Sequence, residues 1–372
     1  MSYLQPWTHN NAKDYSCEII MNPKEQKYID SSIRDFQGCP TVAVTSGGRI
    51  YAGWYAGGTR EPHMDNFNLL VYSDDCGENW SAPLLVIPSN KELCIHALDI
   101  QLWIAPDGSL HVYWVQNNTC KYTEELAEKY GNRVIDGYMF GDKIHAQWRM
   151  ICRNPDAAQP IFSAPEYLDV GFLRCKPLYL RSGRIINFNY DQTNNRYGYS
   201  ISNDGGVTYT RFYGGKKVDT PFDESMAYER LDGSIRMLAR TSCGYLAESY
   251  SFDEGITWTD GVLTEIESPN TRCFVARTPS GRILLINNDH RTDRCRMTAY
   301  LSDDDGVTWK YKRVLDSRMH ISYPDVDFYN GKIYLIHDHD RVKEREILLY
   351  IFTEEELMDK NSIIEPMIIC KP

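Results

Sequence analysis

The chain has 372 residues, of which 42% are hydrophobic, so it can bury a large core. Its formal net charge of −11 at pH 7 argues against nucleic acid or an anionic membrane surface as a partner. The first fifteen residues contain no apolar segment, and no long apolar run follows them. We therefore expect a cytoplasmic protein that does not enter a membrane.

Six short segments of similar sequence predict six β-hairpins. Each has a glycine, a polar residue, and then Ile or Leu, and each lies between two apolar runs. The last three intervals between these glycines are 50, 48 and 50 residues (233 − 183, 281 − 233 and 331 − 281). A hairpin that recurs about every fifty residues is typical of the small antiparallel sheets that form the blades of a β-propeller. The glycines are Gly48, Gly108, Gly183, Gly233, Gly281 and Gly331.

A second repeat is the octapeptide Ser-x-Asp-x-Gly-x-Thr-Trp, or Asp box. It occurs at 73–80, 202–209, 251–258 and 302–309, with Asn79 in place of Thr and Tyr209 in place of Trp. The aspartate can accept hydrogen bonds from its own turn, and the terminal aromatic side chain can pack between sheets. The segment 153–156 resembles a degenerate copy. We expect these boxes to be structural and to lie on blade edges, remote from any cleft.

The two repeats together predict an all-β chain that forms a single six-bladed β-propeller domain over residues 1–372. The blades are expected at about 40–80, 95–153, 171–209, 223–258, 272–309 and 322–352, with an insertion at 116–145 in the second. A short apolar strand near 17–21 is expected to complete the last blade and so close the ring. Thr353 is expected to open a short helix with a capping box.

The cysteines and histidines do not indicate a metal or cofactor site, and we expect none. The number of cysteines, 11, is odd, and no C-x-x-C pair occurs, which argues against both a zinc site and a disulfide framework. The segment 337–340 (His-Asp-His-Asp) lies in a strand pattern, where neighbouring side chains point to opposite faces. Five cysteines lie in or beside apolar strand patterns and are expected to be buried free thiols: Cys39, Cys94, Cys152, Cys175 and Cys273.

Over nearly the whole chain, these repeats resemble the sialidase-type glycoside hydrolases. The resemblance implies a tyrosine nucleophile, a glutamate that activates it, an aspartate acid/base and three arginines that bind the substrate carboxylate. Tyr323, at the first strand of blade six, matches the nucleophile, and Glu224, nine residues before Gly233, matches the activating glutamate. A neutral tyrosine needs such a base, and a tyrosine nucleophile suits an anionic sugar, which would repel a carboxylate.

The resemblance also implies the arginines. Arg240 follows the blade-four hairpin as the family's second arginine does, and Arg294 precedes a blade-five strand as the third does. Arg291 and Arg296 are close rivals of Arg294. The family's first arginine belongs to the motif Tyr-Arg-Ile-Pro, whereas this chain has Phe-Gln-Gly-Cys-Pro at 36–40, so the proline matches and the arginine does not.

The residues of the remaining roles are open. Arg60 or Lys176 could replace the missing arginine. Asp65 is the nearest acid in the loop where the family has its acid/base, and His63 is the alternative. The further candidates are Asp99 and Asp325, the second of which could instead brace its strand.

Three functions are compatible with these residues. The first is a retaining exo-glycosidase that hydrolyses a terminal acidic sugar through a tyrosyl intermediate. The second is another propeller carbohydrase, an exo-arabinanase-like hydrolase or a uronate lyase, in which His63 or Tyr323 moves protons. The third is a non-catalytic glycan-binding propeller. A carboxylate within hydrogen-bond reach of Tyr323 would distinguish an enzyme from a binding module.

Overall fold

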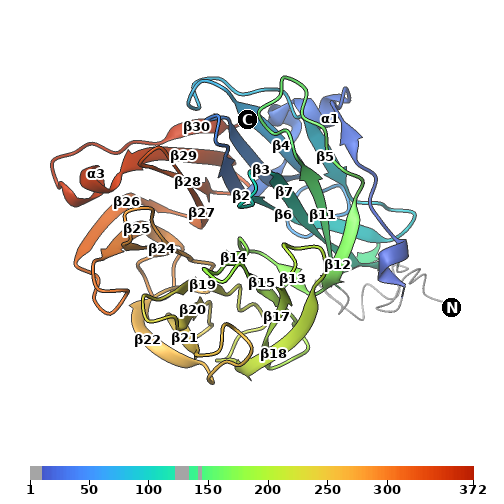
Figure 1. Ribbon diagram of the computed structural model, residues 1–372. Coiled ribbons are helices and arrows are strands. Elements are labelled where there is room, and N and C mark those ends of the chain that lie inside the picture. The colour runs from blue at the N-terminus through green and yellow to red at the C-terminus, as the bar shows by residue number, and fades with distance from the viewer. Residues whose placement is uncertain (1–10, 122–133, 141–144) are drawn as a thin grey trace.

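The computed structural model describes residues 11–121, 134–140 and 145–372. Six antiparallel sheets surround a central axis as the blades of a β-propeller (Figure 1). This confirms the predicted all-β fold. In each blade the first strand lies nearest the axis. These inner strands are β2 (Phe36–Val44), β6 (Ile95–Ile104), β14 (Leu178–Tyr179), β19 (Met226–Glu229), β23 (Phe274–Arg277) and β27 (Ile321–Tyr329).

The second and third strands of each blade follow outward from the axis. The second strands are β3 (Ile50–Gly57), β7 (Leu110–Asn118), β15 (Ile185–Asn187), β20 (Ile235–Ala239), β24 (Ile283–Asn288) and β28 (Lys332–His339). The third strands are β4 (Phe67–Ser73), β11 (His145–Cys152), β17 (Arg196–Ser202), β21 (Tyr245–Ser251), β25 (Cys295–Ser302) and β29 (Glu346–Thr353). Each predicted glycine turn joins a first strand to a second strand, and all six glycines have positive φ, between 74° and 97°. The six predicted hairpins are therefore confirmed.

The fourth strands lie outside the predicted blade ranges, which end at or near the boxes. They are β5 (Leu85–Pro88), β12 (Glu166–Val170), β18 (Thr210–Lys216), β22 (Val262–Glu267), β26 (Tyr311–Met319) and β30 (Met367–Cys370). Most of these strands are partly exposed and carry polar residues, as in the Val-Leu-Thr-Glu-Ile-Glu of β22. The four polar strands therefore lack the apolar runs from which the blades were predicted, whereas β5 (Leu-Val-Ile-Pro) and β30 (Met-Ile-Ile-Cys) are apolar but lie beyond the predicted ends of their blades.

The N-terminal strand is a correction to the prediction. β1 (Ile20–Met21) pairs with β5 and adds a fifth strand to blade one, instead of completing the last blade. The outer strand of blade six is β30, from the C-terminal end of the chain. The ring is closed by side chains instead. Asp325 on β27 accepts a hydrogen bond from the backbone N–H of Val42 at 3.1 Å, and Asp327 accepts one from Val44 at 2.8 Å.

The remaining elements are short. They are η1 (Ala12–Asp14), α1 (Gln26–Ile29), η2 (Ser31–Ile33), α3 (Glu354–Met358), the paired strands β13 (Phe172–Leu173) and β16 (Asn189–Tyr190), and a small sheet of β8 (Cys120–Lys121), β9 (Val134–Ile135) and β10 (Tyr138–Met139). Helix α3 has the predicted capping box. The small sheet belongs to the predicted insertion, of which 122–133 and 141–144 lie outside the described residues. No helix among the described residues is long and apolar enough to cross a membrane.

All four Asp boxes have the predicted geometry. In the fourth box, Asp304 accepts hydrogen bonds from the backbone N–H of Thr308 at 2.8 Å and from its hydroxyl at 2.6 Å. The degenerate copy keeps part of this pattern, since Asn154 accepts a hydrogen bond from the backbone N–H of Ile161. The four boxes follow the third strands, which run parallel to the first strands. They therefore lie at the end of the blades opposite to the start of the inner strands.

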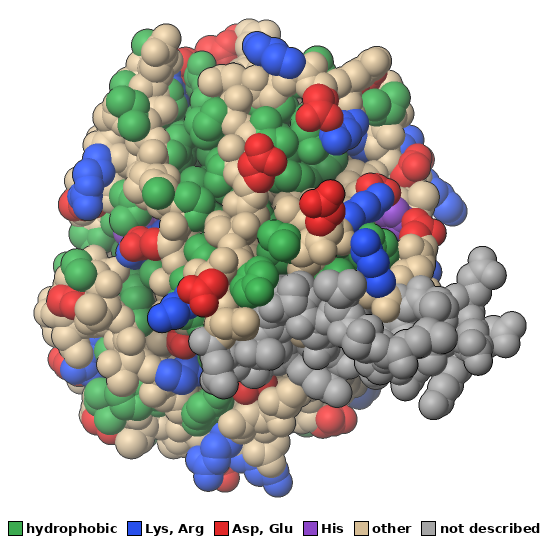
Figure 2. All heavy atoms as spheres, turned by 90° about the vertical axis from the view of Figure 1, so that its right-hand side faces the viewer, with side chains coloured by type: hydrophobic (Ala, Val, Ile, Leu, Met, Phe, Trp, Pro, Cys, Tyr) green, Lys and Arg blue, Asp and Glu red, His purple; other side chains and the backbone are tan. Residues whose placement is uncertain are grey.

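Apolar side chains fill the spaces between neighbouring blades. One cluster joins Leu238 of blade four, Leu284 of blade five and Ile333 of blade six, all of them buried. The five cysteines that were predicted to be buried free thiols are both buried and free. At the surface, acidic and basic side chains are interspersed among the described residues on the face shown in Figure 2.

Candidate active site

A cavity of about 700 Å³ lies at one end of the ring axis. Residues from all six blades line it, and several come from the start of an inner strand or from the segment just before it. The polar ones include Glu61 of blade one, Asp99 of blade two, Arg174 of blade three, Glu224 and Arg240 of blade four, Arg294 of blade five, and Tyr323 and Arg341 of blade six. No Asp-box residue lines it, as expected for structural turns.

Three inner strands are bent where they enter this cavity. The pairing register shifts between Gly38 and Thr41 in β2, between Leu98 and Gln101 in β6, and between Ser322 and Asp325 in β27. Within each irregular segment one residue has a left-handed backbone: Cys39 (φ 56°), Asp99 (φ 60°) and Tyr323 (φ 56°). Such a conformation costs about 1–3 kcal/mol in a residue other than glycine, and it is retained mainly at functional sites, where it redirects a side chain. Glu224, just before β19, shares it (φ 35°).

Tyr323 and Glu224 meet in this cavity, 99 positions apart in the sequence. The Tyr323 hydroxyl donates a hydrogen bond to Glu224 Oε1 at 3.0 Å. Arg240 Nη1 donates to Glu224 Oε2 at 2.8 Å and to the Tyr323 hydroxyl at 3.1 Å. All three side chains are buried. Tyr323 is therefore held between a carboxylate that can accept its proton and a guanidinium that can stabilise its oxyanion.

Glu224 is ionised although it is fully buried. Burial by itself would raise the pKa of this carboxyl, but the positive charges of Arg240, Arg174 and Arg272 outweigh that effect and lower the pKa to about 2. Arg174 Nε lies 3.4 Å from Glu224 Oε1, and the same guanidinium pairs with Asp99. Glu224 is therefore available as a base at neutral pH.

Four guanidinium groups surround the ring of Tyr323. Their central carbons lie 4.4 Å (Arg341), 4.6 Å (Arg174), 5.4 Å (Arg272) and 5.4 Å (Arg294) from the ring centroid. Arg294 thus lies at the cavity, as predicted. Its rivals do not: Arg291 stacks on Tyr245, and Arg296 pairs with Asp289. Several buried or half-buried arginines at one cavity favour an anionic ligand there.

The loop 57–66 brings a different acidic residue to the cavity from the one that was predicted. Asp65 is exposed and pairs with Lys91 at 2.6 Å, outside the cavity. His63 also lies outside, where its ring contacts Asp136 and Asp65, and the side chain of Arg60 is exposed. Glu61 of the same loop lines the cavity instead. The loop carries both acids, and only its path decides which one reaches the axis.

Lys176 and Asp325 lie deeper in the ring and outside the cavity. Lys176 donates to the carbonyl oxygens of Val42 and Leu102 and lies 3.2 Å from Asp325 Oδ2. Asp325 also accepts a hydrogen bond from the Thr41 hydroxyl at 2.7 Å. Lys176 therefore does not reach a ligand in the cavity as a replacement for the missing arginine, and Asp325 braces the inner strands.

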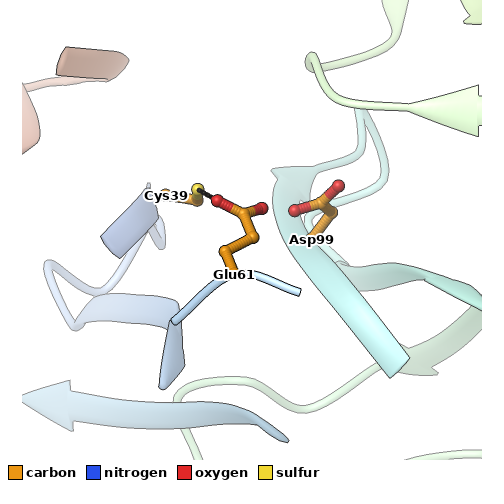
Figure 3. Close-up of side chains that lie close together, drawn as sticks. All are labelled: Cys39, Glu61 and Asp99. Atoms are coloured by element: carbon orange, nitrogen blue, oxygen red, sulfur yellow. Dashed lines mark hydrogen bonds between the residues drawn. The ribbon is translucent and has the colours of Figure 1, made fainter. Parts of the chain in front are cut away.

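Glu61 lies between Cys39 and Asp99, with its carboxylate close to that of Asp99 (Figure 3). One ligand atom of each residue lies within 4.8 Å of those of the other two. Such a group could in principle hold a metal ion, but both carboxylates already have cationic partners. Arg341 Nη1 lies 2.9 Å from Glu61, and Arg174 pairs with Asp99. Two guanidinium groups at this distance disfavour a bound cation.

The segment 337–340 has the predicted alternation. His337 is buried and stacks on Tyr350, whereas His339 lies 2.8 Å from Glu346. Asp338, between them, points toward blade one and accepts a hydrogen bond from the backbone N–H of Cys39 at 2.8 Å. The three side chains do not converge on one point.

Sequence reasoning missed three residues of this site: Glu61, Arg174 and Arg341. Glu61 directly follows Arg60, and Arg174 lies two positions before Lys176, so the right segments were singled out but the wrong members were chosen. Arg341 follows the segment 337–340, which was weighed only as a metal site. Its nearness to blade one depends on ring closure, which no local pattern reveals.

Comparison with known proteins agrees with this architecture. The family model of the BNR repeat-like domain matches residues 48–335. No curated protein matches the chain in sequence. Among solved structures, the intramolecular trans-sialidase from Ruminococcus gnavus is 17% identical, with a TM-score of 0.66 over 90% of this chain and 98% of that one.

Two further structures are similar. The NanB sialidase from Streptococcus pneumoniae is 17% identical, with a TM-score of 0.64 over 87% of this chain and 68% of its own. A protein of unknown function from Dyadobacter fermentans is 16% identical, with a TM-score of 0.63 over 88% and 95% of the two chains. At these identities the likeness concerns the fold. The family match spans most of the chain, which therefore belongs to the BNR repeat-like family and has a sialidase-like propeller fold.

Proposed function

We propose that this protein is a retaining exo-glycosidase that hydrolyses a terminal acidic sugar, with Tyr323 as the nucleophile and Glu224 as its base. The observation that carries the proposal is the buried hydrogen bond of 3.0 Å between the Tyr323 hydroxyl and Glu224 Oε1. A binding module has no need of an ionised carboxylate against one particular tyrosine in its cavity. The arginines at the cavity support an anionic substrate.

In the first step, Tyr323 Oη attacks the anomeric carbon while its proton passes to Glu224. The bond between that carbon and the leaving-group oxygen breaks, and this oxygen takes a proton from Glu61. In the second step, water donates a proton to Glu61 and attacks the same carbon. The bond to Tyr323 then breaks, and Glu224 returns the proton to the tyrosine. Arg240 and Arg294 bind the sugar carboxylate throughout.

Glu61 replaces Asp65 in this proposal because it lines the cavity and Asp65 does not. Each of the two acids pairs with an arginine, but Asp99 is less suited to move protons because its side chain is only 4% exposed, against 28% for Glu61. In the lyase alternative His63 was one of the two residues proposed to move protons, but it lies outside the cavity.

The proposal is tested with aryl glycosides of acidic and neutral sugars, followed by the substitution Tyr323→Phe. This change removes the nucleophilic oxygen and keeps the ring, so turnover is expected to fall by at least ~10²-fold. Tyr199→Phe is a matched control, because Tyr199 is also buried but its hydroxyl donates to the carbonyl of Ile256, away from the cavity. Near-native turnover in Tyr323→Phe would refute the mechanism, and inactivity of the wild type on the whole panel would favour the binding module.

A further inference from the structure

Arg341 is held at the cavity by contacts to blade six, where it lies, and to blade one. It lies in the turn between β28 and β29, and its Nε donates to Asp338 Oδ2 at 2.9 Å. Its Nη2 donates to the Ser322 hydroxyl at 3.2 Å, and its Nη1 to Glu61 Oε2 at 2.9 Å. Its backbone oxygen accepts a hydrogen bond from the N–H of Gln37 on β2, also at 2.9 Å. This guanidinium is therefore fixed in position, and it lies closest of the four to the ring of Tyr323.

Gly38 provides the space that Arg341 occupies. A Cβ atom at position 38 would lie 2.7 Å from Cδ of Arg341 and 2.8 Å from its Cγ and Nε, closer than real Cβ contacts come. Gly38 has no positive φ, so the backbone does not require glycine here. Glycine is required here because a larger residue would collide with the side chain of Arg341.

Position 38 is also where the Tyr-Arg-Ile-Pro motif has its arginine, when the motif is aligned on Pro40. The residue that is missing and the residue that fills its space thus share one location, although they come from opposite ends of the chain. We propose that Arg341 is the third arginine of the carboxylate-binding group and acts together with Arg240 and Arg294. The proposal rests on an acidic sugar being the substrate.

The placement has a consequence for Glu61. In the absence of a ligand, Glu61 is the carboxylate bound to Nη1 of Arg341. A substrate carboxylate at this guanidinium takes over that hydrogen bond and frees Glu61 to turn toward the glycosidic oxygen. Asp338 and Ser322 still hold Nε and Nη2, so Arg341 itself does not need to move.

The experiment measures how strongly the protein prefers an acid to its neutral ester. Calorimetry gives the dissociation constants of N-acetylneuraminate, galacturonate and the methyl ester of each. Arg341→Ala is expected to reduce the acid-over-ester preference by about 10- to 100-fold, the range for a lost hydrogen bond between charged groups. Gly38→Ala is expected to reduce it as well, without removing any charge, because the new Cβ displaces Arg341. Arg318→Ala is the control, since Arg318 lies on β26 of the neighbouring blade five and pairs with Asp316 and Glu346 away from the cavity.

The double variant Gly38→Arg/Arg341→Ala returns an arginine to the family's position and is expected to regain most of the preference. Circular dichroism melting confirms that each variant is folded. A wild type that prefers the acid, with Arg341→Ala and Gly38→Ala unchanged, would overturn the role of Arg341 and leave the proposed function standing. A wild type with no preference for either acid would overturn both.

Discussion

Replacing Glu224 with glutamine is expected to destabilise the protein, although the two side chains have nearly the same shape. Arg240 and Arg174 outweigh the effect of burial and lower the pKa of Glu224 from 4.5 to about 2. A difference of about 2.5 units corresponds to roughly 3 kcal/mol in favour of the ionised form. Glutamine leaves the buried guanidinium groups without their counter-charge, so the free energy of unfolding should fall by about that amount at pH 7.

This change is measurable as a melting temperature. With an unfolding entropy of about 2.1 cal/mol/K per residue, 372 residues give roughly 0.8 kcal/mol/K, so 3 kcal/mol lowers Tm by about 4 °C. The pKa is lower in the folded state, so the stabilisation is complete above about pH 4.5 and is lost as the pH falls toward about 2. The difference in Tm between wild type and Glu224→Gln should therefore shrink over that range.

Thermal unfolding followed by circular dichroism at a series of pH values tests both points. Glu78→Gln makes the same chemical change at an exposed position and should leave Tm unaltered throughout. Equal melting temperatures for wild type and Glu224→Gln at pH 7 would refute the reasoning. A difference that stayed constant down to pH 2 would show that the ion pairs are not its source.

Three other substitutions separate structural from catalytic residues. Asp304→Ala removes the acceptor of two hydrogen bonds from Thr308 and should lower Tm with unchanged turnover per folded molecule; lost turnover at native Tm would contradict the structural role of the box. Glu61→Gln should lower turnover strongly on a substrate with a poor leaving group and much less on a nitrophenyl glycoside, which departs without a proton. Asp65→Asn should leave both rates near those of the wild type, and the reverse pattern in steady-state kinetics would return the acid/base role to Asp65.

The fold was predictable because its signals are local and repeated. The glycine turns and the boxes are each a few residues long, and a blade is one short stretch of chain. Four of the outer strands were missed because they are partly exposed and carry polar residues, so no apolar run marks them, and the apolar β5 and β30 were missed because they lie after the expected ends of their blades. The pairing of β1 was predicted wrongly, since nothing local indicates which sheet edge is still free.

Site residues could be predicted only where the position that the family resemblance implies also lies at the start of an inner strand. Tyr323 and Glu224 lie at the start of inner strands, so they meet at the axis as expected. The other groups lie on loops or on neighbouring positions, where the path of the backbone decides which side chain reaches the cavity. Glu61 and Asp65 differ by four positions in one loop, yet only one of them lines the cavity.

The pairing of β1 with β5 has a consequence for how the molecule assembles during synthesis. Ile20 pairs with Val86, so blade one can be complete as soon as the chain has been made as far as Pro88, the end of β5. A strand that had to wait for blade six would stay unpaired while some 300 more residues emerged, with a larger loop-closure cost and an exposed edge in the meantime. Here each blade can finish in turn, and the ring closes last, when finished surfaces dock through Asp325 and Asp327. The junction between the first and last blades is then also where the ring should open first under denaturant, as amide exchange along β2 and β27 would report.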